Sequence, residues 1–108
     1  MAAQSVISAV MATIEERKRT MPEKSYVVKL LKGGTDAAAC KLAEETGEVI
    51  KACREETQEQ QIKEFGDLFF HALVLMAQKD IKLEHVEAEL AKRHGISGLD
   101  EKAARKKS

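Results

Sequence analysis

The residues that most constrain the fold run from Glu64 to Met76, where two carboxylates lead directly into an almost entirely apolar stretch. Residues 68–76 read LFFHALVLM, so a helix built from them is apolar on nearly every side, as in a central, buried helix. Glu64 and Asp67 are three residues apart and therefore share one face of this helix. Because a buried carboxylate without a partner is costly, the sequence predicts that something cationic compensates these two acids.

A second acid cluster precedes this stretch, in the sequence EETGE at residues 44–48. On a helical wheel Glu45 borders the apolar stripe, Glu48 lies about 60° further round, and Glu44 lies further out. The wheel therefore predicts that Glu45 and Glu48 face inward and that Glu44 is more solvated. Two such clusters on consecutive antiparallel helices would meet. Their all-oxygen donor set favours Mg²⁺, with Mn²⁺ as a substitute, over zinc or iron.

Two other interpretations of the acid clusters start from their spacing alone. Acids three residues apart are common on solvated helix faces, where nearby lysines pair with them. This interpretation is disfavoured because one of the clusters opens the most apolar helix. A di-iron carboxylate bundle requires Glu-x-x-His pairs, but the residues three before the histidines are Leu68, Lys82 and Ala91. The di-iron interpretation is therefore excluded.

Composition favours an all-α domain and argues against several classes of protein. Helix formers dominate the 108 residues, which include only one proline. The 18 basic and 18 acidic side chains balance, which argues against general nucleic-acid binding, and aromatic residues for stacking on bases are scarce. The first residues lack a signal-peptide pattern, and no stretch reaches the roughly 18 apolar residues of a membrane span. We expect a cytoplasmic protein without a membrane segment.

Hydrophobic periodicity predicts a bundle of four to five helices in a single domain spanning residues 1–108. Ser25, Thr35 and Thr57 are the expected N-caps, and Thr57 with Gln60 reads as a capping box. Gly33 and Gly34 are interpreted as a turn rather than as a phosphate-binding loop. The charged tail from about residue 100 is predicted to be mobile. The expected helices cover about residues 5–19, 25–32, 35–56, 57–78 and 84–93.

Several side chains are predicted to be buried. Cys40 and Cys53 lie on one predicted helix about 20 Å apart, too far for a disulfide, and are interpreted as buried thiols in a reducing compartment. His71, one turn after Asp67, is more typical of a hydrogen-bonded core histidine than of a ligand. The inward apolar residues expected on the last two helices are Ile62, Phe65, Phe69, Leu73 and Met76, then Val86 and Leu90.

Four segments together resemble one family of enzymes. They read SYVVKLL at 25–31, KLAEETGE at 41–48, EFGDLFFH at 64–71 and ELAKRHG at 89–95. These segments closely resemble the phosphoribosyl-ATP pyrophosphatase family of histidine biosynthesis, over roughly residues 5–100. The acid signature alone is shared by the wider all-α NTP pyrophosphohydrolase superfamily, so the first and last segments select the family. One departure is Ala43, where the family usually has glycine.

The resemblance implies an activity and an assembly. The activity is Mg²⁺-dependent hydrolysis of phosphoribosyl-ATP to phosphoribosyl-AMP and pyrophosphate, the second step of histidine biosynthesis. Many organisms fuse this domain to a cyclohydrolase, and the sequence shows none, so the single-function form is expected. Members of the superfamily assemble as dimers or higher oligomers. We therefore expect a homodimer or higher homo-oligomer in which a second subunit completes the helical bundle.

The resemblance also assigns candidate site residues. The family's metal-binding acids fall on Glu45, Glu48, Glu64 and Asp67, with Glu44 beside them. Either Glu45 or Glu48 is the candidate catalytic base that accepts a proton from the attacking water. The candidate cations for the triphosphate and the ribosyl 5′-phosphate are Lys29, Lys32, Lys41 and Arg93.

Two other functions remain open at this point. One is a housekeeping pyrophosphatase of the same superfamily that acts on non-canonical nucleoside triphosphates. The other is a helical interaction module without enzyme activity, in which the acid clusters are surface charges. Either enzymatic function requires the carboxylates of both clusters, whereas the interaction module does not.

Overall fold

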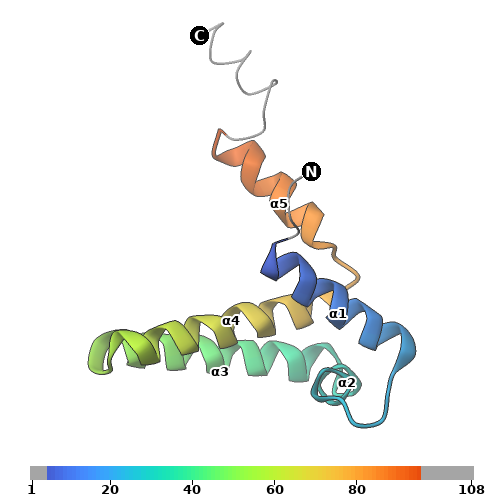
Figure 1. Ribbon diagram of the computed structural model, residues 1–108, viewed down its shortest axis with the longest axis horizontal. Coiled ribbons are helices and arrows are strands. Elements are labelled where there is room, and N and C mark those ends of the chain that lie inside the picture. Colours follow the sequence, from blue (N-terminus) through green and yellow to red (C-terminus); the bar gives the residue numbers. More distant parts are fainter. Residues whose placement is uncertain (1–4, 96–108) are drawn as a thin grey trace, which may run out of the picture.

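The computed structural model describes residues 5–95, and this part of the chain forms five helices and no strand (Figure 1). The predicted all-α class is therefore confirmed, whereas the predicted tail beyond residue 100 lies outside the described residues. No helix among them is long and apolar enough to cross a membrane. The helices are α1 (Val6–Thr20), α2 (Tyr26–Lys32), α3 (Gly34–Glu55), α4 (Gln58–Gln78) and α5 (Leu83–Arg93).

Helices α3 and α4 form a long hairpin that lies along the length of the molecule (Figure 1). Thr57 caps α4 as predicted, because its hydroxyl accepts a hydrogen bond from the backbone N–H of Gln60 at 3.2 Å. The reciprocal half of the predicted capping box is wrong, since the Gln60 side chain donates to Glu64 instead. The Gln61 amide donates to the backbone oxygens of Ala52 and Glu56, which ties the end of α3 to the start of α4.

The main core lies where α1 and α2 pack on the C-terminal half of α4. Ser25 caps α2 as predicted, accepting hydrogen bonds from the backbone N–H of Val28 and from the Arg17 guanidinium, both at 3.2 Å. These bonds hold α2 against the end of α1. The buried members of the core are Met11, Ile14, Val27, Leu31, Leu73, Val74 and Ala77.

The junction between α2 and α3 differs from the prediction. Helix α3 begins at Gly34, with Gly33 rather than Thr35 at its N-cap position. The reason is that α2 passes into α3 almost without a break, since the backbone N–H of Gly33 still bonds to Leu30 in the last turn of α2. The change of direction occurs at Gly34, whose φ of 84° lies in the region that glycine adopts most readily.

The cysteines and the last helix were predicted to be buried, but in the single chain they are not. Cys40 and Cys53 are both exposed, because the buried stripe of α3 passes through Ala38, Val49 and Ala52 instead. Helix α5 has no buried residue and projects away from the hairpin (Figure 1). Its Leu90, predicted to face inward, is 50% exposed.

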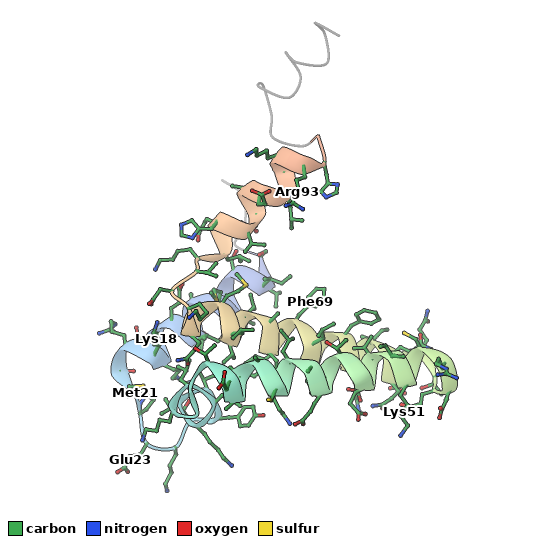
Figure 2. The ribbon with its side chains drawn as sticks, turned by 180° about the vertical axis from the view of Figure 1, so that it is seen from behind. Lys18, Met21, Glu23, Lys51, Phe69 and Arg93 are labelled. Carbon is green, nitrogen blue, oxygen red and sulfur yellow. The ribbon has the colours of Figure 1, made fainter. Side chains whose placement is uncertain are left out.

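The predicted burial of α4 is correct only for its C-terminal half. Leu73 and Val74 are buried, but Ile62, Phe65 and Phe69 are 66%, 44% and 52% exposed. Figure 2 shows Phe69 on the side of α4 that faces away from α3. These three side chains are exposed because α1 and α2 cover only the C-terminal half of α4. An extended apolar strip is therefore left on the surface of the single chain.

Ala52 tests the packing between the two long helices. It is 0% exposed, so Ala52→Leu must place three extra carbon atoms into filled space. We expect this substitution to lower the free energy of unfolding by about 1–3 kcal/mol, measured by urea denaturation. Ala39→Leu makes the same change at an exposed position of α3 and should change the free energy of unfolding by less than about 0.5 kcal/mol. Equal shifts would contradict the packing described here.

Candidate active site

The hairpin brings three of the five predicted acids together. Glu45 comes from α3, whereas Glu64 and Asp67 come from adjacent turns of α4. One carboxylate oxygen of each lies within 4.8 Å of the others. Glu45 and Glu64 are half-buried and Asp67 is exposed. Like charges this close repel one another, and three oxygen donors are a set that suits a hard divalent cation such as Mg²⁺.

The other two predicted acids lie outside this group of three. Glu48 and Glu44 are both exposed on α3. The predicted inward position is therefore right for Glu45 and wrong for Glu48, because the buried stripe of α3 passes through Val49 and Ala52 and leaves Glu48 beside it on the exposed side. Glu44 is solvated as predicted and lies 3.5 Å from the ammonium of Lys41, which raises the pKa of that lysine. The role of Glu48 as a metal ligand stays a prediction.

A glutamine holds one of the three acids in place. The side-chain amide of Gln60 donates a hydrogen bond of 2.8 Å to Oε2 of Glu64. The two residues are four apart on α4, so they lie on the same face. The sequence interpretation placed Gln60 at the helix cap and missed this contact. The spacing of four residues between Gln60 and Glu64 could have indicated this contact.

His71 is buried as predicted, but it also faces the acid group. Its Nε2 lies 3.9 Å from Oε1 of Glu45, and the two side chains are 6% and 14% exposed. The rings of Phe70 and Tyr26 approach it edge-on, with centroids 5.1 and 6.1 Å away. Burial lowers the pKa of His71 and outweighs the opposing effect of the Glu45 carboxylate. This shift favours the neutral form of the imidazole.

Three of the four predicted cations lie on α2 and α3. Lys41 is half-buried, one helical turn before Glu45. Lys29 and Lys32 line a hollow of about 440 Å³ together with Tyr26. Tyr26, which lines this hollow, also contacts His71, and His71 faces Glu45.

Arg93, the fourth predicted cation, lies elsewhere. It is on α5, where its guanidinium bonds to Glu89 at 2.7 Å. Figure 2 shows Arg93 on the helix that projects away from the hairpin. Within one chain the fold therefore does not bring it to the three acids.

A helical hairpin that gathers carboxylates from both of its helices agrees with the all-α pyrophosphohydrolase class that the sequence resemblance implied. The family model described as phosphoribosyl-ATP pyrophosphohydrolase matches residues 7–94 of this chain. The chain therefore belongs to the phosphoribosyl-ATP pyrophosphohydrolase family, as the sequence resemblance predicted, and it is a pyrophosphohydrolase enzyme.

Individual relatives match along almost the whole chain. A phosphoribosyl-ATP pyrophosphatase of Neisseria meningitidis serogroup C is 45% identical over 104 residues, covering 96% of this chain and 97% of the relative. The protein of the same name from Nitrosospira multiformis is 49% identical over 94 residues, or 87% of this chain and 78% of the relative. That of Azoarcus is 42% identical over 101 residues, covering 94% of each chain.

Proposed function

We propose that this chain hydrolyses phosphoribosyl-ATP to phosphoribosyl-AMP and pyrophosphate in histidine biosynthesis. The observation that carries the proposal is the acid group formed by Glu45, Glu64 and Asp67. It occurs in a chain that relatives named phosphoribosyl-ATP pyrophosphatase match over nearly the full length. The acid group supports pyrophosphate chemistry, and the relatives' name supports the substrate. A place in a biosynthetic pathway also agrees with the expected cytoplasmic location.

We propose that Mg²⁺, or Mn²⁺ in its place, is the cofactor and that Glu45, Glu64 and Asp67 hold it. Glu48 is the next candidate ligand on α3, and Glu44 the outermost. When bound, the cation would supply charge neutralisation at the phosphate oxygens and would make a water molecule more acidic. Gln60 restrains the Glu64 carboxylate through its hydrogen bond. Glu45, and after it Glu48, is the candidate to accept the proton of the attacking water.

The lysines are proposed to bind the two anionic ends of the substrate. Lys41, one turn from Glu45 on α3, is proposed to contact the triphosphate. Lys29 and Lys32, which line the hollow with Tyr26, are proposed to bind the ribosyl 5′-phosphate. Ammonium groups on flexible side chains suit this purpose because they donate charge-assisted hydrogen bonds to phosphate oxygens.

A homodimer or higher homo-oligomer is proposed as the working form. The exposed apolar strip on α4 continues into a groove of about 240 Å³ that α1 and α4 share. Its exposed members include Val6 and Phe69, which are 78% and 52% exposed. A second copy that covers this strip would complete the bundle. Arg93 is then proposed to act at the partner's site, since it lies apart from the acids of its own chain.

A substrate panel tests the proposed function. Purified protein with Mg²⁺ should convert phosphoribosyl-ATP to phosphoribosyl-AMP and pyrophosphate, with kcat/KM at least about 100-fold above that for canonical and non-canonical nucleoside triphosphates. Chromatography of the nucleotides measures the rate of hydrolysis of phosphoribosyl-ATP and of each triphosphate. Chelation of the metal should stop turnover until Mg²⁺ is restored. Turnover of the triphosphates alone would favour a housekeeping pyrophosphatase. No turnover of any nucleotide would contradict both enzymatic functions.

A further inference from the structure

The buried polar side chains of residues 5–95 are Ser25 and His71. Ser25 has a structural explanation, because it caps α2 and accepts a hydrogen bond from Arg17. His71 caps no helix, and its position on α4 points its imidazole across to α3. Burying an imidazole costs free energy unless a polar partner compensates it. The group that Nε2 approaches is the carboxylate of Glu45.

The imidazole of His71 is enclosed by aromatic rings from two helices. Phe70 meets it edge-on at an interplanar angle of 74°, and Tyr26 of α2 meets it at 81°. The Tyr26 and Phe70 rings in turn stack on each other at 18°, with centroids 6.2 Å apart. Rings held in this way have little freedom to rotate, so the direction of Nε2 is fixed by packing between α2 and α4.

The chemistry of the ring suits a donor role. An imidazole carries at least one N–H whether it is neutral or protonated. A carboxylate accepts hydrogen bonds and cannot donate them when ionised, so the nitrogen that faces it is the one that carries the hydrogen. The separation of 3.9 Å is longer than a formed hydrogen bond, so the bond requires one of the two side chains to move closer to the other.

We propose that His71 is a positioning residue, whose Nε2–H holds the Glu45 carboxylate toward Glu64 and Asp67. An unrestrained glutamate loses side-chain conformational freedom when it becomes ordered. A fixed donor at His71 orders the Glu45 side chain in advance, so less conformational freedom is lost when the cation binds. Groups that orient metal ligands in this way typically change metal affinity or activity by about 10–100-fold. The inference rests on the proposed function, since it needs the three acids to hold a cation.

Metal titration without substrate provides the test. His71→Phe keeps an aromatic ring of similar shape and removes the donor, whereas His71→Gln keeps a donor at a similar reach. We expect His71→Phe to raise the Kd for Mn²⁺, measured by electron paramagnetic resonance, by about 10–100-fold. His71→Gln should recover most of this loss. His85→Phe alters an exposed histidine on α5 and should leave Mn²⁺ binding unchanged.

A kinetic comparison adds a second readout. At saturating Mg²⁺ we expect His71→Phe to lower kcat with little change in KM for phosphoribosyl-ATP, because the substitution affects a metal-holding acid and not the phosphate-binding lysines. Equal Mn²⁺ affinity of His71→Phe and the unaltered protein would overturn the positioning role. An unaltered protein that binds Mn²⁺ but does not hydrolyse phosphoribosyl-ATP would instead overturn the proposed substrate, and the metal titration would still decide on His71. Absence of Mn²⁺ binding by the unaltered protein would overturn both proposals.

Tyr26 gives a second route if His71→Phe does not fold. Tyr26 is 51% exposed, so its truncation removes one wall of the imidazole without opening the main core. We expect Tyr26→Ala to weaken Mn²⁺ binding several-fold and Tyr26→Phe, which keeps the ring, to leave it unchanged. Equal Mn²⁺ affinity of these two variants would also overturn the proposal.

Discussion

Glu45→Gln should reduce Mg²⁺-dependent turnover of phosphoribosyl-ATP by about 1,000-fold or more while the helices stay folded. Glutamine keeps the size of the side chain but removes the charge from the half-buried member of the group on α3. A loss of this size corresponds to about 4 kcal/mol of transition-state stabilisation, which is reasonable for a group that both binds the cation and accepts a proton. Steady-state kinetics measures the loss, and circular dichroism checks the fold.

The matched control is Glu44→Gln, one residue earlier on the same helix. Glu44 is 66% exposed at its side chain and pairs with Lys41, so we expect a loss below about 5-fold. Equal losses at the two positions would contradict the arrangement described for α3. Glu48→Gln, although exposed in the single chain, should behave like Glu45→Gln if the family assignment of metal ligands carries over. Full activity of Glu48→Gln would remove Glu48 from the proposed metal set.

Phe69→Glu should weaken self-association by about 100-fold or more. The ring of Phe69 is 52% exposed within one chain and belongs to the apolar strip proposed as the contact between two copies. Burying a carboxylate there without a partner opposes association far more than loss of the ring alone. Sedimentation over a range of protein concentrations should show a dimer for the unaltered chain and a monomer for the variant. Turnover at micromolar concentration should fall in parallel.

Lys51→Glu provides the control for this prediction. It also introduces a glutamate on the hairpin, but Figure 2 shows Lys51 on the side of α3 that faces away from α4. Its sedimentation should match that of the unaltered chain. A Phe69→Glu variant that sediments like the unaltered chain would contradict the proposed contact, and a second copy would then not explain the exposed strip.

Features that depend on local sequence were predictable. Ser25 and Thr57 cap the helices expected of them, because an N-cap requires only a hydroxyl and a backbone N–H three residues later. The meeting of Glu45 with Glu64 and Asp67 also followed from helical spacing and from a short connection between two helices. Thr35 failed as a cap because the preceding helix runs on into the next, which local preference does not reveal.

Features that depend on distant packing were not predictable. Phe65 and Phe69 are exposed because α1 and α2 cover the other half of α4. The apolar pattern of a helix does not indicate which half will be covered. Cys53 points outward because the α3 stripe that meets α4 passes through Ala52. The contact of His71 with Glu45 joins two helices and depends on a ring from a third, so no spacing within one helix could indicate it.

The position of the acids along α4 links cofactor binding to protein concentration. Asp67 and Glu64 lie in the half of α4 that is supported only by α3, whereas His71 lies near the half that the core encloses. Backbone amides of the half that the core encloses should exchange slowly with deuterium even in a lone chain. Those around Glu64 should exchange quickly until a second copy covers them. Dilution should therefore weaken the apparent metal affinity, and added metal should in turn favour assembly, because each event stabilises the same stretch of helix.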